Sequence, residues 1–236
     1  MKKFLALIFV VALISGCAHP LNISPDISAI NKSTPVAKST KSISYYFTEN
    51  IEKEVTTPGG GGDSVKYRPY KELDTGIYKV LSDNFKSVVM QKGGVSQSKL
   101  ENDLVAEITI STNSSSSSAF TWPPTLFGVN ISTDLLDTKT GKKEKILVVG
   151  EGRAEFEEFK SNFNLSAKRA SEDALNKFGT AIAGAELLKV GAGEEKKSVV
   201  HPKEVRLREL KRLFDGGLID AAVYNERLKA ILSDGN

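Results

Sequence analysis

The chain has 236 residues, of which 40% are hydrophobic and 26% charged, and this composition suits one medium-sized domain with appendages. It carries 32 basic and 29 acidic side chains. Because Lys2 and Lys3 lie in the leader described next, the remainder is close to neutral, which argues against a nucleic-acid-binding protein. The single cysteine excludes a fold held by internal disulfides.

Residues 1–16 have the plan of a secretory leader. Two lysines precede an apolar run from Phe4 to Ile14, and small residues follow, as in a signal peptide. The run is shorter than the roughly 20 apolar residues that a membrane-spanning helix needs. The stretch LISGC, residues 13–17, resembles the lipobox of bacterial lipoproteins. That resemblance implies cleavage before Cys17 and acylation of this cysteine.

The lipobox resemblance also implies where the protein is attached. Two or three acyl chains bind a membrane almost irreversibly, because burial is worth about 0.8 kcal/mol per methylene. Ala18 follows the cysteine, in place of the aspartate that favours inner-membrane retention in enterobacterial lipoproteins. The resemblance therefore implies the outer membrane, with the chain facing the periplasm. The alternative is an ordinary secretory signal with an unrelated cysteine.

Residues 17–41 are predicted to form a flexible tether. This segment is rich in Ser, Asn, Pro and Lys and contains few aromatic residues, so it buries too little apolar area to offset its ordering entropy. A flexible segment of this length spans about 25 to 30 Å on average.

Residues 42–190 are predicted to form an α+β domain. Alternating apolar residues predict strands over residues 43–47, 65–67, 104–111, 129–135 and 146–156. Helical spacing predicts one helix over residues 74–92, with Asp74 as its N-cap, and another over residues 162–190. We therefore predict an antiparallel sheet with two helices packed on one face.

The order of these elements, with the segments LNISPDI and DLLDTKTGK, resembles the small outer-membrane lipoproteins of the YajG type. More loosely, it resembles the auxiliary lipoproteins of envelope ABC transporters. The resemblance covers residues 17–185 and implies a binding or assembly role in the cell envelope.

The run TTPGGGGD, residues 56–63, lacks the features of a phosphate-binding loop. A P-loop places a lysine directly after its last glycine and leads into a helix, whereas here Asp63 follows and a strand is predicted. We interpret Gly59–Gly62 as a turn between the strand of Tyr45 and the strand of Tyr67.

The loop between two predicted strands, residues 113–128, contains the candidate partner-binding residues. These are Phe120, Trp122, Leu126 and Phe127. Loops lie at the surface, and exposed aromatic groups there mark contacts with a protein or a membrane. The alternative is that Trp122 and Phe127 fold back onto the edge of the sheet.

Residues 191–202 are predicted to be a linker, and residues 203–236 to form a helical hairpin. The turn DGGLI at 215–219, Tyr224 and the end from Leu228 to Leu232 resemble the SHOCT domain, although Ala221-Ala222 replace acidic residues. Two short helices bury too little to be stable alone, so we expect self-association or docking to another protein; packing on the chain's own sheet is the alternative. The candidate oligomerisation residues are Leu207, Leu210, Phe214, Leu218, Ile219, Tyr224, Leu228 and Leu232.

The sequence does not favour catalysis. His19 and His201 lie outside the predicted domain, and neither a zinc-binding motif nor a nucleophile elbow is present. We expect no metal, cofactor or catalytic residue; Glu151 and Glu155, on one side of a predicted strand, are the alternative acid pair. The sequence thus favours a lipid-anchored binding protein, with a carrier of a lipid or other apolar ligand as the alternative.

Overall fold

The computed structural model describes residues 18–31, 38–91, 102–116, 123–189, 210–211, 214 and 221–233. They belong to two compact units, residues 1–188 and 189–236. The strands are β1 Ala18–Pro20, β2 Ser39–Phe47, β3 Val55–Gly60, β4 Asp63–Tyr67, β5 Phe85–Met90, β6 Leu104–Ser115, β7 Leu126–Asp137 and β8 Lys143–Arg153. The helices are the 3-10 helix η1 Ile27–Ala29 and the α-helices α2 Pro69–Asn84, α3 Phe156–Phe159, α4 Leu165–Ala183, α5 Glu186–Lys189 and α7 Ala221–Ser233.

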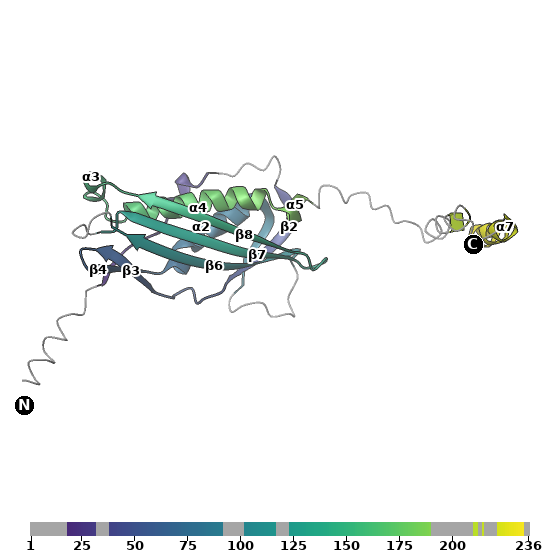
Figure 1. The fold of residues 1–236 in the computed structure, drawn as a ribbon, viewed down its shortest axis with the longest axis horizontal. Coiled ribbons are helices and arrows are strands. Elements are labelled where there is room, and N and C mark those ends of the chain that lie inside the picture. Colours follow the sequence, from purple (N-terminus) through teal and green to yellow (C-terminus); the bar gives the residue numbers. More distant parts are fainter. Residues whose placement is uncertain are drawn as a thin grey trace, which may run out of the picture. The chain divides into compact units, whose positions relative to one another are not determined.

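The larger unit is an α+β domain with two sheets, which confirms the predicted fold class. A five-stranded sheet has the order β5-β2-β6-β7-β8, and a three-stranded sheet has the order β1-β4-β3 (Figure 1). Strands β6, β7 and β8 form an antiparallel meander. The prediction of an antiparallel sheet is wrong for β2, which runs parallel to both β5 and β6. The crossover through α2 allows this pairing, because parallel strands need a long connection.

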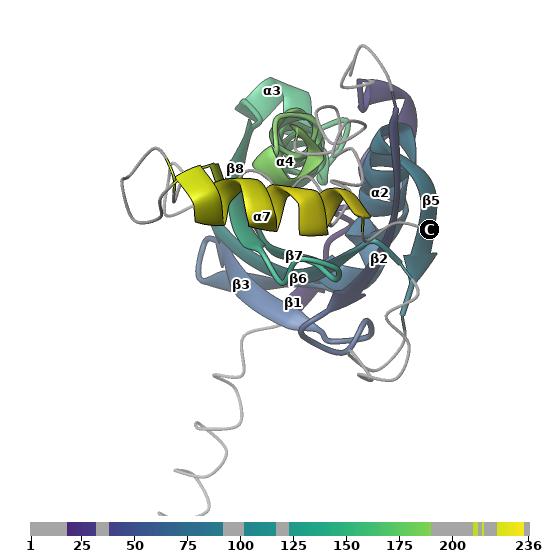
Figure 2. The same ribbon diagram turned by 90° about the vertical axis from the view of Figure 1, so that its right-hand side faces the viewer.

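Helices α2 and α4 pack on one face of the five-stranded sheet, as predicted, and the sheet curves beneath them (Figure 2). Along β7, Phe127, Val129, Ile131 and Leu135 are buried, and the alternate residues face the other side. Gly150 and Gly152 on β8 lie directly against the α4 backbone. The lack of a side chain at these glycines therefore sets the close approach of α4 to the sheet.

The predicted helix over residues 74–92 begins and ends earlier than expected. Helix α2 starts with Pro69 in its first turn and ends at Asn84, because proline suits the first helical position. Asp74 lies inside the helix and accepts a hydrogen bond of 2.7 Å from the Tyr45 hydroxyl, so it is not the N-cap. The following residues, 85–90, form β5 because their β-branched and aromatic side chains pair beside β2.

The predicted tether is wrong for residues 18–31. Ala18–Pro20 pair with β4, and Leu21, Ile23 and Ile30 are buried. We call residues 21–31 the N-terminal strap, because they run along α4. Side chains of α4 and the residue before it, Asn164, Glu172 and Asn176, accept hydrogen bonds from the strap's backbone N–H groups. The burial of these three apolar side chains adds to the hydrogen bonds that hold the strap against the domain.

Two further boundaries differ from the predictions. The strand predicted to reach residue 156 ends at Arg153, because Glu155 and Glu158 form a capping box that starts α3. The long helix predicted to reach residue 190 ends at Ala183, with Gly184 as its C-cap. These caps make the strand and the helix shorter than the apolar patterns in the sequence predict.

In the smaller unit, the second helix of the predicted hairpin is present as α7. Of the first predicted helix, the structure describes Leu210, Lys211 and Phe214, which are helical. The rings of Phe214 and Tyr224 lie 4.6 Å apart between centroids, so one ring from each predicted helix meets the other.

Candidate functional site

One end of the larger unit holds the start of β1, directly after Cys17. Ala18 pairs with Ser64, and Ser64 pairs with Pro58 on β3. The Ser114 hydroxyl donates to the Pro58 carbonyl oxygen at 2.6 Å, so the end of β6 is level with this hairpin. Cys17 itself lies outside the described residues.

The same level continues across the five-stranded sheet. Ser114 pairs with Phe127 on β7, and Phe127 pairs with Gly152 on β8. We call this the Ala18 end of the domain. It comprises the start of β1, the β3–β4 turn, the end of β6, the start of β7, the end of β8 and helix α3 (Figure 1).

The glycine run forms the tip of a hairpin at the Ala18 end. Gly60 pairs with Asp63 across the turn, and the two residues between them, Gly61 and Gly62, have φ angles of 62° and 87°. Two positive φ angles are typical of the tightest hairpin turns, which glycine accommodates. The turn therefore joins β3 to β4, and the prediction that it joins the strand of Tyr45 to that of Tyr67 is wrong.

The predicted partner-binding residues divide between the two faces of β7. Leu126 is 40% exposed on the outer face. Phe127 is buried and meets the Tyr67 ring edge-on at 5.3 Å, so its ring is part of the core. Phe120 and Trp122 lie outside the described residues.

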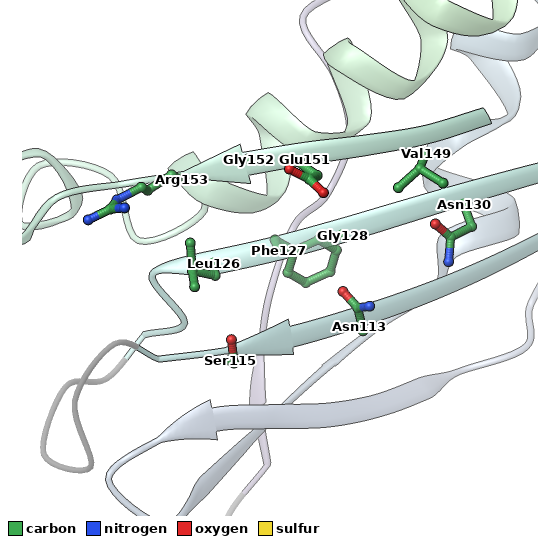
Figure 3. A pocket seen from close by; sticks show the side chains of 10 residues that line it. All are labelled: Asn113, Ser115, Leu126, Phe127, Gly128, Asn130, Val149, Glu151, Gly152 and Arg153. Atoms are coloured by element: carbon green, nitrogen blue, oxygen red, sulfur yellow. The ribbon is translucent and has the colours of Figure 1, made fainter.

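A hollow of about 550 Å³ opens on the outer face of the sheet at the Ala18 end (Figure 3). Side chains from the last part of β6, the first part of β7 and the last part of β8 surround Gly128. A Cβ atom at Gly128 would collide with the Asn113 side chain. The missing side chain therefore opens the hollow and lets Asn113 lean across β7.

The hollow offers both apolar and polar contacts. Leu126 and Val149 are 40% and 45% exposed at its sides. The amides of Asn113 and Asn130 and the charged ends of Glu151 and Arg153 complete its lining. Amides donate and accept hydrogen bonds at once, so this surface suits the backbone and side chains of a polypeptide. Sequence reasoning identified Leu126 but missed the neighbouring strands, because β6, β7 and β8 come together only through pairing.

The neighbouring edge of β8 is occupied by side chains of α4. The Glu151 N–H donates to Asp173 at 2.9 Å, and Lys177 donates to the Val149 carbonyl at 2.9 Å. Arg169 donates to the Arg153 carbonyl at 2.7 Å. These contacts satisfy groups that an edge strand would otherwise offer to a second strand. The face of the sheet at the Ala18 end is therefore more accessible to a partner than this part of its edge.

The opposite end of the domain is held by two carboxylates. Asp103 accepts from Lys139 and from the backbone and hydroxyl of Ser42, and these contacts hold its pKa well below the usual range. Burial raises the pKa of Asp137, but hydrogen bonds from Thr140 and Lys41 outweigh it and lower the pKa to about 2. Both carboxylates are thus ionised structural groups that fasten β2, β6 and the β7–β8 turn.

The alternative acid pair is not brought together on one strand. Glu151 lies on β8, whereas Glu155 caps α3 and accepts a hydrogen bond of 2.7 Å from Arg153. Across the described ranges, no group of three or more His, Cys, Asp or Glu side chains is arranged to hold a metal ion. His19 lies 3.6 Å from Asp63 beside the glycine turn, and His201 is outside the described residues.

The candidate oligomerisation residues are described only in part. Leu210 is buried and Phe214 is 39% exposed. Tyr224 and Leu228 are half-buried on one side of α7. The structure gives no burial for the remaining candidates, Leu207, Leu218, Ile219 and Leu232. None of the helices in the described part of the chain has the length and apolarity needed to cross a bilayer.

No protein-family model matches the chain, and no curated protein is similar to it in sequence. A Xanthomonas campestris protein of a family of unknown function is 12% identical over 74% of this chain and 94% of that one, with a TM-score of 0.42. The PelC dodecamer from Paraburkholderia phytofirmans is 11% identical over 63% and 92%, with a TM-score of 0.37. A candidate lipoprotein from Caulobacter crescentus is 16% identical over 67% and 92%, with a TM-score of 0.25. Likenesses this distant carry no function from those proteins to this chain.

Proposed function

We propose that this protein is a bacterial lipoprotein of the cell envelope, anchored through acylated Cys17 and acting by binding. The lipobox LISGC, after two lysines and an apolar run, is the observation that carries the anchoring. Ala18 after the cysteine favours the outer membrane, with the domain on the periplasmic side.

Metabolic labelling with a palmitate analogue tests the anchor. The parent protein is expected to take up the label and to fractionate with membranes, because two or three acyl chains bind almost irreversibly. A Cys17→Ser variant is expected to lose both. Label retained in Cys17→Ser, or absent from the parent, would contradict acylation at this residue.

The hollow around Gly128 is the proposed binding surface, and an extended segment of an envelope protein is the proposed partner. The hollow has apolar sides and the two amide side chains of Asn113 and Asn130. This lining fits a polypeptide better than a lipid tail, because a lipid tail forms no hydrogen bonds. The carrier hypothesis needs space between sheet and helices. There, α4 is in direct contact with Gly150 and Gly152, and the core is filled by large side chains such as Tyr70 and Phe178.

Photo-cross-linking in cells tests this surface. A photoreactive residue in place of Val149 is expected to capture an envelope protein, whereas one in place of Thr140, exposed at the opposite end of the domain, is expected not to do so. Gly128→Val should abolish the Val149 product by filling the hollow while the protein stays folded. Equal capture from both positions, or capture insensitive to Gly128→Val, would argue against this site.

We further propose that the C-terminal hairpin, residues 203–236, associates with a second copy. Tyr224, Leu228 and Ile231 recur at helical spacing on α7 and are only half-buried, as an interface helix would be. Light scattering should give a larger species for the full chain than for a chain ending at residue 202. The same monomeric mass for both would exclude self-association through this hairpin.

A further inference from the structure

The domain has no free length of chain between its first strand and Cys17. Ala18 is already paired with Ser64, and consecutive Cα atoms lie about 3.8 Å apart. If Cys17 is acylated as proposed above, the Ala18 end must therefore lie against the lipid headgroups. A flexible tether would have held the domain about 25 Å away.

Two aromatic side chains are exposed at this same end. Phe156 is 56% exposed at the start of α3, and Phe163 is 50% exposed just before α4. Both residues come after Gly152 in the chain. Strand pairing across the two sheets places Gly152 at the same height along the strands as Ala18. The connection from β8 to α4 therefore extends beyond the level of Ala18, toward the side on which Cys17 is attached.

The charges around these rings balance. The carboxylates of α3 and its cap meet three basic side chains, in the pairs Glu155 with Arg153, Glu157 with Lys160, and Glu158 with Arg169. Lys160 also lies 4.3 Å from the centroid of the Phe156 ring. The surface thus presents apolar rings without a net charge, so its attraction to a membrane should come from apolar burial rather than from anionic lipid.

We propose that Phe156 and Phe163 insert into the lipid headgroup region and seat the Ala18 end of the domain on the membrane. The acyl chains supply one point of attachment, about which the domain could tilt. The two rings supply a second contact, on the far side of β6 and β7 from β1. This orientation keeps the hollow around Gly128 next to the bilayer surface. This inference rests on the proposed acylation of Cys17.

Fluorescence quenching in vesicles tests the seating with the full-length acylated protein. Cys17 is the single cysteine, so a cysteine introduced elsewhere is the one free thiol after acylation. Ser161→Cys places a probe between Phe156 and Phe163 in the sequence, and Thr140→Cys places one at the opposite end of the domain. Both positions are exposed. The lipids are phosphatidylcholine carrying a headgroup nitroxide quencher, with or without phosphatidylglycerol.

The Ser161 probe is expected to be quenched strongly and the Thr140 probe weakly, with little change on adding phosphatidylglycerol or salt. In the double variant Phe156→Ser and Phe163→Ser, quenching at Ser161 should fall toward the Thr140 level while the circular dichroism spectrum is unchanged. Each single variant should give an intermediate loss, and Phe163→Trp should retain the quenching.

Two failures are distinguishable. If the protein takes up no palmitate label and Cys17 itself reacts with the probe, both the acylation and the seating are overturned. If the protein is acylated but the two probes are quenched equally, or if quenching at Ser161 survives removal of both rings, the seating alone is overturned.

Discussion

Replacing Gly150 with alanine tests whether the contact between β8 and α4 holds the domain together. A Cβ at this position would lie 2.5 Å from the Ala174 Cβ and still closer to the Ala170 carbonyl oxygen and the Ala174 nitrogen. Carbon atoms pack at about 3.5 to 4.0 Å, so α4 would have to recede by about 1 Å. Because backbone atoms cannot rotate away, we expect a loss of about 3 kcal/mol, the upper part of the range for overpacking.

A loss of this size corresponds to a fall in Tm of about 6 to 12 °C for a domain of this length, measurable by circular dichroism during heating. Gly184→Ala is the matched control. Its Cβ would meet the Thr180 and Ala181 carbonyl oxygens at 3.5 and 3.7 Å, which are ordinary contacts, so its Tm should stay within about 2 °C of the parent. A Gly150→Ala protein as stable as Gly184→Ala would refute this account of the packing.

Asp137→Asn should lower the free energy of unfolding by about 2 to 3 kcal/mol, because Lys41, whose Nζ lies 3.1 Å from the carboxylate, loses its counter-ion. Urea denaturation measures this change. A change below about 0.5 kcal/mol would contradict the prediction. The folded-state pKa of Asp137 is lowered from 3.8 to about 2. Its stabilising effect should therefore be complete above the ordinary value and be lost as the pH falls toward 2, and acid titrations of Asp137→Asn should lack this component. Phe127→Ala should cost about 3 to 5 kcal/mol because the ring is buried, whereas Leu126→Ala, one residue earlier, should cost less than about 1 kcal/mol; equal losses would contradict the assigned faces of β7.

The antiparallel meander was predictable because it is local. The alternation of apolar and polar residues in 104–111 and 129–135 indicates directly which face of each strand is buried. The partners of β2 were not predictable in this way. Parallel pairing with β5 and β6 joins segments separated by a hairpin and a helix, and no periodicity encodes which neighbour a strand chooses.

The candidate site was likewise predictable only where it depends on local sequence. Leu126 was predictable as an exposed apolar residue at the start of a strand, whereas the sequence left open whether Phe127 next to it is exposed or folds back onto the sheet. The hollow depends on Gly128 and on residues of three strands, which the sequence presents as separate stretches. The exposure of Phe156 and Phe163 likewise depends on the connection from β8 to α4, which contains the unpredicted helix α3.

By itself, the sequence determined the features that depend on composition and short-range pattern: the α+β class, the two packed helices and the α7 helix. Only the tertiary structure decided that residues 18–31 are bound to the domain rather than forming a tether. A composition average treats those residues as too polar to fold. Burial of Leu21, Ile23 and Ile30 becomes favourable only when β4, α2 and α4 have already formed the surfaces that receive them.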